Sequence, residues 1–294
     1  MTLKIAAQAS ENDKHEWDIN HILYYKGKLY SGSDDGKIKV WSTKLNLEAE
    51  VQAHPCSVYY LAANEDSLYS CSNEGTIKTW DLETLKEKNT IDQDENTEFW
   101  AIAFLNGCLF AGDQSGNIRA YKDNKFYGAF GIAEPIKDMA TDNNSTIFSS
   151  NILDVVITKV YVEREKIQYG AKASIDGKAP LALVGNKLCF SSRDGKSIIV
   201  HKNDEVEIYP RLTEQKDAHE LMINSMAGAT LKGEDILFTA GWDKTLKRWR
   251  VDDESIKAVE NMSLSFVVTK MTVGDDGQLF VGGENGVLVR VDVS

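Results

Sequence analysis

The sequence predicts an all-β protein, a seven-bladed β-propeller that occupies the whole chain. Two observations carry this prediction: a motif that recurs about every 40 residues, and four strand-like segments within each period. The 294 residues accommodate seven copies of that length. The clearest copies are residues 29–41, 68–80, 109–121 and 237–249, and looser copies are residues 147–161, 188–201 and 279–291.

Each copy has the pattern of two strands joined by a tight turn. In the first copy, residues alternate in character on both sides of the pair Asp35-Gly36, which is the period-2 pattern of strands. Glycine tolerates positive φ, so such pairs suit hairpin turns. A short apolar segment precedes each hairpin, as in residues 58–62, and a more polar one follows, as in residues 46–51. One copy therefore supplies the four strands of a propeller blade.

These copies resemble the repeats of the WD40 family. The resemblance rests on the Trp-Asp dipeptide at Trp80 and on the tryptophans Trp41 and Trp249. It also rests on histidines such as His54 that stand four residues before Val or Ile, although Ala-His replaces the family's usual Gly-His. The resemblance covers essentially the whole chain. It implies the fold and leaves the function open, because this fold hosts many unrelated functions.

The resemblance also implies a buried hydrogen-bonded tetrad in several blades. In the family, the histidine joins a Ser or Thr, the tryptophan and a turn acid, and a buried indole N–H or imidazole needs such partners. A Ser–His–Asp grouping also fits a hydrolase, but its recurrence at the repeat spacing favours a structural role. The expected tetrads are His15, Ser31, Asp35 and Trp41; His54, Ser70, Glu74 and Trp80; and His219, Thr239, Asp243 and Trp249.

The two ends of the chain predict how the ring closes. The seventh copy stops after its third strand, and residues 3–9 form an alternating segment outside the repeats. We expect this segment to complete the last blade, the alternative being a disordered tail. The expected single domain spans residues 1–294, with blades at 15–53, 54–93, 95–133, 134–177, 178–217, 218–262 and 263–294 plus 3–9.

Copies four and five depart from the pattern. Copy four has no turn glycine, and copy five has His201 where other copies have tryptophan. Their tetrads cannot be complete. This degeneracy could mark a partner surface, but sequence drift in a tolerant fold is the favoured explanation.

The net charge of −12 argues against nucleic-acid binding, which draws on Lys and Arg. The nearest basic cluster, Lys244, Lys247, Arg248 and Arg250, alternates with apolar residues, so we expect it on a solvated blade face. No apolar run is long enough to span a membrane.

The cysteines predict a reducing compartment. Cys56, Cys71, Cys108 and Cys189 are scattered without the spacing of a metal site, and most fall within expected strands. We therefore expect no disulfide, and a location in the cytoplasm or the nucleus.

Catalytic motifs are missing from the sequence. It contains no phosphate-binding loop, no Gly-x-Ser-x-Gly elbow and no metal-binding helix motif. The paired carboxylates fall at turns, where ordinary turn chemistry explains them. We expect no enzyme activity, no metal and no cofactor.

The expected partner site lies on the face that carries the loops before the first strand and between the second and third strands. There Trp242 occupies a turn position that is mostly Asp, Asn, Gln or Glu in other copies. Trp17, Met222 (or Leu221) and Phe266 come from neighbouring blades, although Trp17, Met222 and Phe266 could equally turn inward. The expected partner-binding residues are Trp17, Asp34, Met222, Trp242, Phe266 and Glu284.

An apolar centre with acidic neighbours suits a short basic or amphipathic peptide. The sequence thus predicts a non-enzymatic protein-interaction scaffold or adaptor, a monomer within a larger complex. The alternative is a nuclear subunit that binds chromatin or histone tails, or a ribonucleoprotein-associated propeller. The Trp-Asp-x-Arg motif of ubiquitin-ligase receptors is absent from the sequence, since Trp80-Asp81-Leu82 is followed by Glu83.

Overall fold

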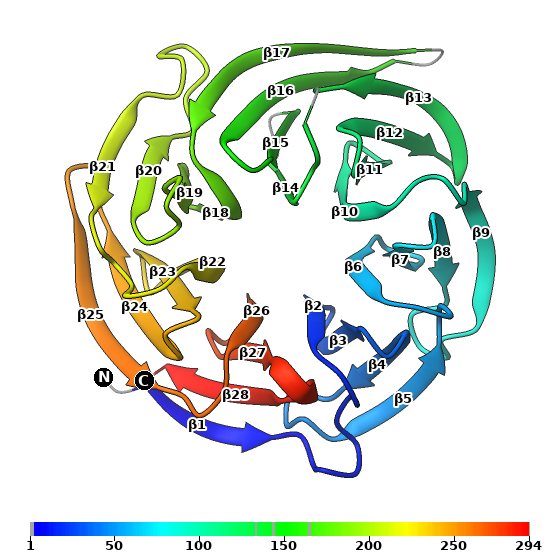
Figure 1. The fold of residues 1–294 in the computed structure, drawn as a ribbon, viewed down its shortest axis with the longest axis horizontal. Helices are drawn as coiled ribbons and strands as arrows, with labels where there is room; N and C mark the ends of the chain where they lie inside the picture. The colour runs from blue at the N-terminus through cyan, green and yellow to red at the C-terminus, as the bar shows by residue number, and fades with distance from the viewer. Residues whose placement is uncertain (1–2, 133, 143–144, 164–165, 294) are drawn as a thin grey trace.

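The chain forms a ring of seven four-stranded antiparallel sheets around a central channel (Figure 1). The computed structural model describes residues 3–132, 134–142, 145–163 and 166–293. The ring confirms the predicted seven-bladed propeller. Two ends of the expected blades, residues 133 and 294, lie outside the described residues.

The first four blades each use four consecutive strands, ordered from the channel outward (Figure 1). Blade one contains β2 (Ile19–Tyr25), β3 (Lys28–Ser33), β4 (Lys37–Trp41) and β5 (Leu47–Gln52). Blade two contains β6 (Val58–Ala63), β7 (Leu68–Ser72), β8 (Thr76–Trp80) and β9 (Glu87–Gln93). Blade three contains β10 (Phe99–Leu105), β11 (Cys108–Asp113), β12 (Asn117–Lys122) and β13 (Lys125–Gly131). Blade four contains β14 (Asp138–Thr141), β15 (Thr146–Ser150), β16 (Asp154–Val162) and β17 (Ile167–Asp176).

The remaining blades follow the same order, except that the last one combines both ends of the chain. Blade five contains β18 (Lys178–Val184), β19 (Lys187–Ser191), β20 (Ile198–Lys202) and β21 (Arg211–Gln215). Blade six contains β22 (Ile223–Leu231), β23 (Glu234–Gly241), β24 (Thr245–Val251) and β25 (Ile256–Ser263). Blade seven contains β26 (Val268–Val273), β27 (Leu279–Gly283), the 3-10 turn η1 (Glu284–Gly286), β28 (Leu288–Val293) and β1 (Leu3–Gln8).

Strand β1 closes the ring, as predicted. It runs antiparallel to β28, with Leu3 opposite Val293 and Ile5 opposite Val291. The Leu3 side chain is buried in the core between blades six and seven. The Leu3 backbone N–H also donates to Glu260 Oε1 of blade six at 2.7 Å. The N-terminal segment thus completes blade seven and ties it to its neighbour.

The apolar core is divided into separate clusters, each shared by two adjacent blades. Between blades one and two, for example, Ile38 and Val40 pack with Val58 and Leu68. The described residues form seven such clusters, one for each neighbouring pair around the ring. Burial of this apolar surface stabilises each blade only when its neighbour is present. This arrangement explains why the alternation in the sequence recurs with the repeat period.

The turn glycines satisfy two requirements at once. Gly36 has φ of 75°, a conformation that is costly for residues with a Cβ. A Cβ built on Gly36 would lie 2.3 Å from the backbone oxygen of His54 in the next blade. Blade six uses Lys244, with φ of 56°, at the corresponding position. The Gly36 turn therefore also allows the blades to approach closely.

Blades four and five, whose repeats depart from the pattern, keep the same fold with different residues in place of the turn glycine and the tryptophan. In blade four, the Asn151 side chain accepts from the backbone N–H groups of Leu153 and Asp154 at 2.7 and 2.6 Å, which forms a turn without glycine. In blade five, His201 stacks on Phe190, and its Nδ1 lies 2.6 Å from the Tyr209 carbonyl oxygen. His201 thus fills the position of the tryptophan.

The expectation of a solvated basic face on blade six is wrong for Arg248, which is buried. Lys247 Nζ donates to the Ala218 carbonyl at 2.6 Å. Only Lys244 and Arg250 lie mainly at the surface, where they pair with Glu284 and Glu234. The sequence alternation placed these side chains on a strand, but it could not show that the neighbouring loop covers part of the strand.

Candidate binding face and central channel

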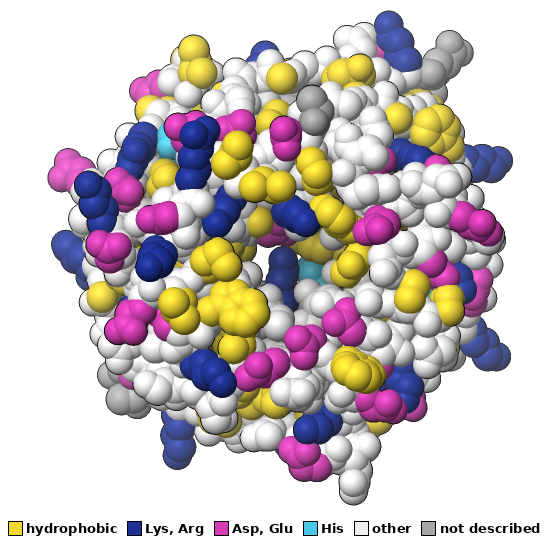
Figure 2. All heavy atoms as spheres, viewed as in Figure 1, with side chains coloured by type: hydrophobic (Ala, Val, Ile, Leu, Met, Phe, Trp, Pro, Cys, Tyr) yellow, Lys and Arg dark blue, Asp and Glu magenta, His cyan; other side chains and the backbone are white. Residues whose placement is uncertain are grey.

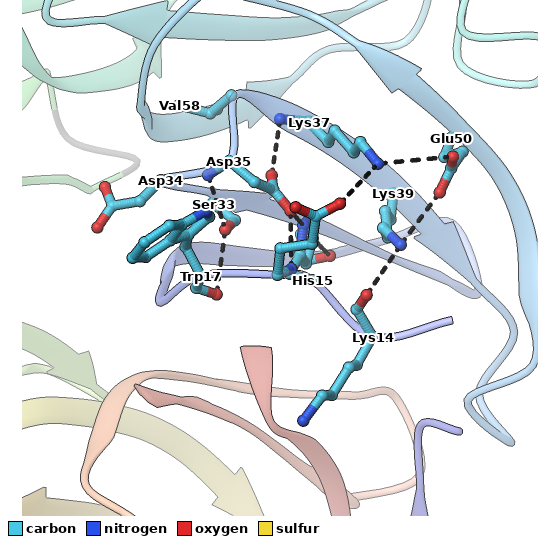
Figure 3. Close-up of polar contacts among 12 residues, drawn as sticks. Lys14, His15, Trp17, Ser33, Asp34, Asp35, Lys37, Lys39, Glu50 and Val58 are labelled. Atoms are coloured by element: carbon cyan, nitrogen blue, oxygen red, sulfur yellow. Dashed lines mark hydrogen bonds and ion pairs between the residues drawn. The ribbon is translucent and has the colours of Figure 1, made fainter. Parts of the chain in front are cut away.

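The tetrad of blade one forms a continuous hydrogen-bonded chain. Trp41 Nε1 donates to Ser31 Oγ at 2.8 Å, and His15 Nε2 lies 2.7 Å from the same oxygen. Because Ser31 accepts from the indole, its own proton points to His15 Nε2. The Nδ1–H of His15 then donates to Asp35 Oδ2 at 2.9 Å (Figure 3).

Blades two and six repeat this chain. In blade two, His54 lies 2.7 Å from Ser70 Oγ and 2.8 Å from Glu74 Oε1. In blade six, His219 lies 2.8 Å from Thr239 Oγ1 and 3.0 Å from Asp243 Oδ2. The tryptophan of each blade, Trp80 or Trp249, donates to the same hydroxyl as the histidine at 2.9 or 2.8 Å.

The tetrad hydroxyls cannot act as surface nucleophiles. Ser31, Ser70 and Thr239 are each 0% exposed, and each hydroxyl is already used by both an indole and an imidazole. Burial lowers the pKa of His15, and this effect outweighs the opposing effect of the hydrogen bond that His15 donates to Asp35. The neutral histidine serves as a hydrogen-bonding link inside the blade.

A lysine extends each of the three tetrads, and sequence reasoning missed it. Lys39 Nζ donates to the carbonyl of Lys14, immediately before His15, at 3.1 Å (Figure 3). Lys78 and Lys247 donate to the equivalent carbonyls before the other two histidines at 3.1 and 2.6 Å. The signal was present as a lysine two residues before the tryptophan in all three copies. This lysine fixes the loop that carries the histidine.

Most of the expected partner-binding side chains lie at the surface. Trp17 is 64% exposed, Trp242 52%, Leu221 50% and Met222 46%. Phe266 is different: it is only 6% exposed and belongs to the core between blades six and seven. The expectation that Phe266 contacts a partner is therefore wrong.

The burial of Phe266 has a local cause in blade seven. The last residue of the second strand is Ser33 in blade one, whereas it is Gly283 in blade seven. A Cβ built on Gly283 would lie 2.3 Å from the Phe266 ring. The ring occupies the space left by the missing side chain.

Trp17 and Asp34 project in the same direction from adjacent loops of blade one (Figure 3). Ser33 Oγ donates to the Trp17 carbonyl at 3.2 Å, which holds the two loops together. Asp34 Oδ1 accepts from Asn20 Nδ2 at 2.6 Å. Asp34 is exposed, so its second carboxylate oxygen faces solvent.

Leu221, Met222 and Trp242 form what we call the blade-six patch. The backbone N–H of Trp242 donates to the Met222 carbonyl at 2.9 Å and joins the two loops that carry these residues. Figure 2 shows hydrophobic side chains gathered at the edge of the central opening, with acidic and basic side chains around them. Glu284 of blade seven is already engaged, since its Oε1 accepts from Val267 N and Lys244 Nζ at 3.1 and 3.3 Å.

A β-bulge at the start of the innermost strand aims one residue of a blade into the channel. In blade one, for example, the pairing of β2 with β3 shifts between Ile19 and His21, which leaves Asn20 unpaired. Asn20 Nδ2 then donates to the Val58 carbonyl of the next blade at 3.3 Å. The same shift leaves Tyr59, Trp100, Asn224 and Thr269 unpaired in blades two, three, six and seven.

The mouth of the channel holds a cavity of about 300 Å³. Aromatic rings, lysines and amides line it. The lining residues are Asn20, Tyr59, Tyr60, Trp100, Lys137, Asp138, Ala179, Pro180, Asn224, Thr269 and Lys270. We call this cavity the channel-mouth pocket.

Asp138 joins four blades at the floor of this pocket. Its carboxylate accepts from Tyr60 Oη at 3.0 Å, from the Leu181 backbone N–H at 3.0 Å and from Lys270 Nζ at 3.4 Å. His21 lies against the Tyr60 ring, with 3.7 Å between ring centroids. Burial, followed by the charge of Asp138, holds the pKa of Tyr60 well above its usual range. The Asp138 charge is thus fully used within the protein.

The described residues contain no group of three or more His, Cys, Asp or Glu side chains arranged to hold a metal ion. Within the same ranges, no helix is long and apolar enough to cross a membrane. The four cysteines are all free.

Comparisons with known proteins agree with this architecture. The family model for the WD domain, G-beta repeat, matches residues 12–42 and 45–81. The first two blades therefore match WD40 repeats, and the chain as a whole has the architecture of a seven-bladed β-propeller. No curated protein sequence matches the chain.

Solved structures show the fold over the full length of the chain. A structure of U3-55K is 13% identical with a TM-score of 0.81, and the match covers 99% of this chain and 98% of that one. The RRP9 WD40 repeats are 14% identical with a TM-score of 0.80, covering 98% and 100%. The WD40 β-propeller domain of Doa1 is 13% identical with a TM-score of 0.75, covering 100% and 97%. At these identities the likeness shows the fold alone.

Proposed function

We propose that this propeller is a non-enzymatic scaffold or adaptor that binds a short peptide segment of a partner protein. WD40 propellers generally mediate protein interactions. The observation that carries the proposal is the blade-six patch: Leu221, Met222 and Trp242 are about half exposed on adjoining loops. Their side chains support no core cluster of the described residues. Aromatic residues and methionine in such positions are typical of interaction hot spots.

Acidic charge near the patch supports a basic or amphipathic peptide as the ligand. Asp34 keeps a free carboxylate oxygen beside Trp17, and the whole chain is acidic. A basic side chain of the peptide would pair with Asp34 while an apolar side chain contacts the blade-six patch, and such complementarity favours association. The burial of the tetrad hydroxyls supports the non-enzymatic role.

The proposed setting is the cytoplasm or the nucleus, with the chain as a single copy within a larger complex. The four free cysteines support a reducing compartment. Each blade packs against its neighbours within the one chain, so the ring is complete without a second copy.

The test compares three versions of the full chain as baits: wild type, Trp242→Ala and Val259→Ala. Val259 is a matched control, because it is 45% exposed and lies on β25, the outer strand of the same blade. We expect Trp242→Ala to weaken partner binding by about 2 kcal/mol, the scale of a hot-spot residue. Binding assays with the partner identified by mass spectrometry should show no change for Val259→Ala. Equal binding by all three proteins would contradict the proposed site.

A further inference from the structure

The channel-mouth pocket has a chemistry different from that of the blade-six patch. On one wall, Lys137 Nζ lies 3.5 Å from the centroid of the Trp100 ring. Trp100 Nε1 donates to Glu98 Oε2 at 2.9 Å, which fixes the indole plane. The ammonium of Lys137 is therefore held over a fixed aromatic ring at the edge of the pocket.

Lys137 carries a charge that the described part of the protein leaves unpaired. No carboxylate within the described ranges lies at ion-pair distance from its Nζ, and the side chain is exposed. Lys270, the other lysine of the pocket, is paired with Asp138 at 3.4 Å. Asp138 is also engaged by Tyr60 and Leu181, and its ion pair is made with Lys270 and not with Lys137. A positive group thus stands unpaired in a chain of net charge −12.

Tyr59 adds an unused hydrogen-bonding group to the same wall. It occupies the bulge position of blade two, between Val58 and Tyr60. The polar residues Asn20, Asn224 and Thr269 at the equivalent positions each donate to a carbonyl of the next blade. The Tyr59 hydroxyl has no hydrogen-bond partner among the described residues.

The opposite wall of the pocket is apolar. Blade five contributes Ala179 and Pro180, and neither side chain offers a hydrogen-bonding group. The pocket therefore combines one unpaired ammonium, one free hydroxyl, an indole face and an apolar wall.

We propose that the channel-mouth pocket binds an aspartate or glutamate side chain of the partner peptide. The carboxylate would contact Lys137 Nζ and the Tyr59 hydroxyl, and an adjacent apolar group of the peptide would lie between Trp100 and Pro180. A monoanion fits better than a phosphate, because the pocket offers a single unpaired cation and Glu98 lies beside the Trp100 indole. The inference rests on the proposed function, since it assigns one anchor of the same peptide.

The test uses three defined dipeptides with the full-length protein: acetyl-Phe-Asp-amide, acetyl-Phe-Asn-amide and acetyl-Phe-phosphoSer-amide. Binding is followed by NMR through the indole N–H resonance of Trp100, assigned with Trp100→Phe. We expect the aspartyl peptide to bind at least about 10-fold more tightly than its isosteric amide, a difference of about 1.4 kcal/mol. Lys137→Met should remove this preference, and Lys137→Arg should keep it.

The inference would be overturned by equal binding of the Asp and Asn peptides, by an Asp preference that survives Lys137→Met, or by a phosphoserine peptide that binds far more tightly than the Asp peptide. No binding by any peptide would also overturn it. Trp242→Ala separates this result from the proposed function, because Trp242 does not line the pocket. Loss of partner capture in Trp242→Ala with an intact Asp preference supports both. If the Asp preference is intact but Trp242→Ala captures the partner as well as wild type does, only the role of the blade-six patch is contradicted.

Discussion

Two regions of this propeller use polar side chains in opposite ways. Inside blades one, two and six, each hydroxyl, imidazole and indole of the tetrads has a hydrogen-bond partner and is buried. At the channel mouth, Lys137 has no carboxylate partner and Tyr59 has no hydrogen-bond partner in the described part of the chain. Buried polar groups whose hydrogen bonds are all made within the protein stabilise the fold. Polar groups without such a partner can still bind a ligand.

Tryptophan shows the same contrast. Trp41 is 0% exposed and donates to a buried serine, whereas Trp242 is 52% exposed on a turn. The two side chains are chemically identical, so their substitution separates stability from binding.

Trp41→Ala should lower the free energy of unfolding by about 3–5 kcal/mol, the usual cost of emptying a large buried aromatic site. Trp242→Ala should change it by less than about 0.5 kcal/mol, as expected for a surface substitution. Urea unfolding of the two variants beside wild type measures both values. Similar losses in the two variants would mean that the contrast between the regions is false.

Deletion of residues 1–9 should destabilise the protein by about 3 kcal/mol, because it removes the β1 ladder and the buried Leu3 side chain. It also exposes β28 as an open edge, which favours aggregation. Thermal melting and soluble yield measure these effects. Lys4→Ala, an exposed position on the same strand, serves as the control. An unchanged melting temperature after the deletion would falsify the role of β1 in closure.

His219→Ala should cost about 1–3 kcal/mol, because it removes the buried imidazole that links the Thr239 hydroxyl to the Asp243 carboxylate. The effect should appear in denaturant unfolding, with no accompanying loss of any hydrolytic activity. Lys216→Ala, an exposed residue in the same loop, should have little effect. A hydrolase activity that disappears in His219→Ala while stability is retained would contradict the structural role.

Stability should fall as the pH is lowered from about 6.5, the ordinary pKa of histidine. Burial is the main cause that lowers the pKa of His15, His54 and His219 in the folded protein. Between the folded and unfolded pKa values, the unfolded chain binds more protons, so the free energy of unfolding decreases with decreasing pH. Urea unfolding at pH 8, 7, 6 and 5 measures this dependence.

The same series with His219→Ala sharpens the test. Removing one of the three tetrad histidines should reduce the slope between pH 6.5 and 5. An identical slope in wild type and His219→Ala would show that the tetrad histidine does not contribute to the acid sensitivity.

The sequence predicted the fold because its signals are periodic. The hairpin turns, the tryptophans and the histidine spacing recur in register, so each copy supports the others. Closure by β1 could also be predicted, because the last copy lacks one strand. The lysine that extends each tetrad was equally periodic and was missed, since its long side chain suggested a solvated position.

The channel-mouth pocket could not be predicted, because its parts have no fixed spacing. A shift of one residue in the pairing of β6 with β7 turns Tyr59 toward the channel, and the same shift between β10 and β11 turns Trp100. Lys137 reaches Trp100 only because the ring places blades three and four side by side. No pattern in the sequence indicates these contacts. The error at Phe266 has a similar origin, since the burial of its ring depends on the space above Gly283.

The central claim is that the partner contacts the loop face of the propeller, which carries exposed side chains available for binding, and not the outer edge of the blades. Site-specific photo-crosslinking tests it most directly, with a photoreactive phenylalanine derivative at position 242 or, as control, at position 259 of the full chain. Both native residues are about half exposed, on different sides of blade six. We predict a covalent adduct with the captured partner from position 242 and none from position 259. An adduct from position 259 alone would contradict the claim.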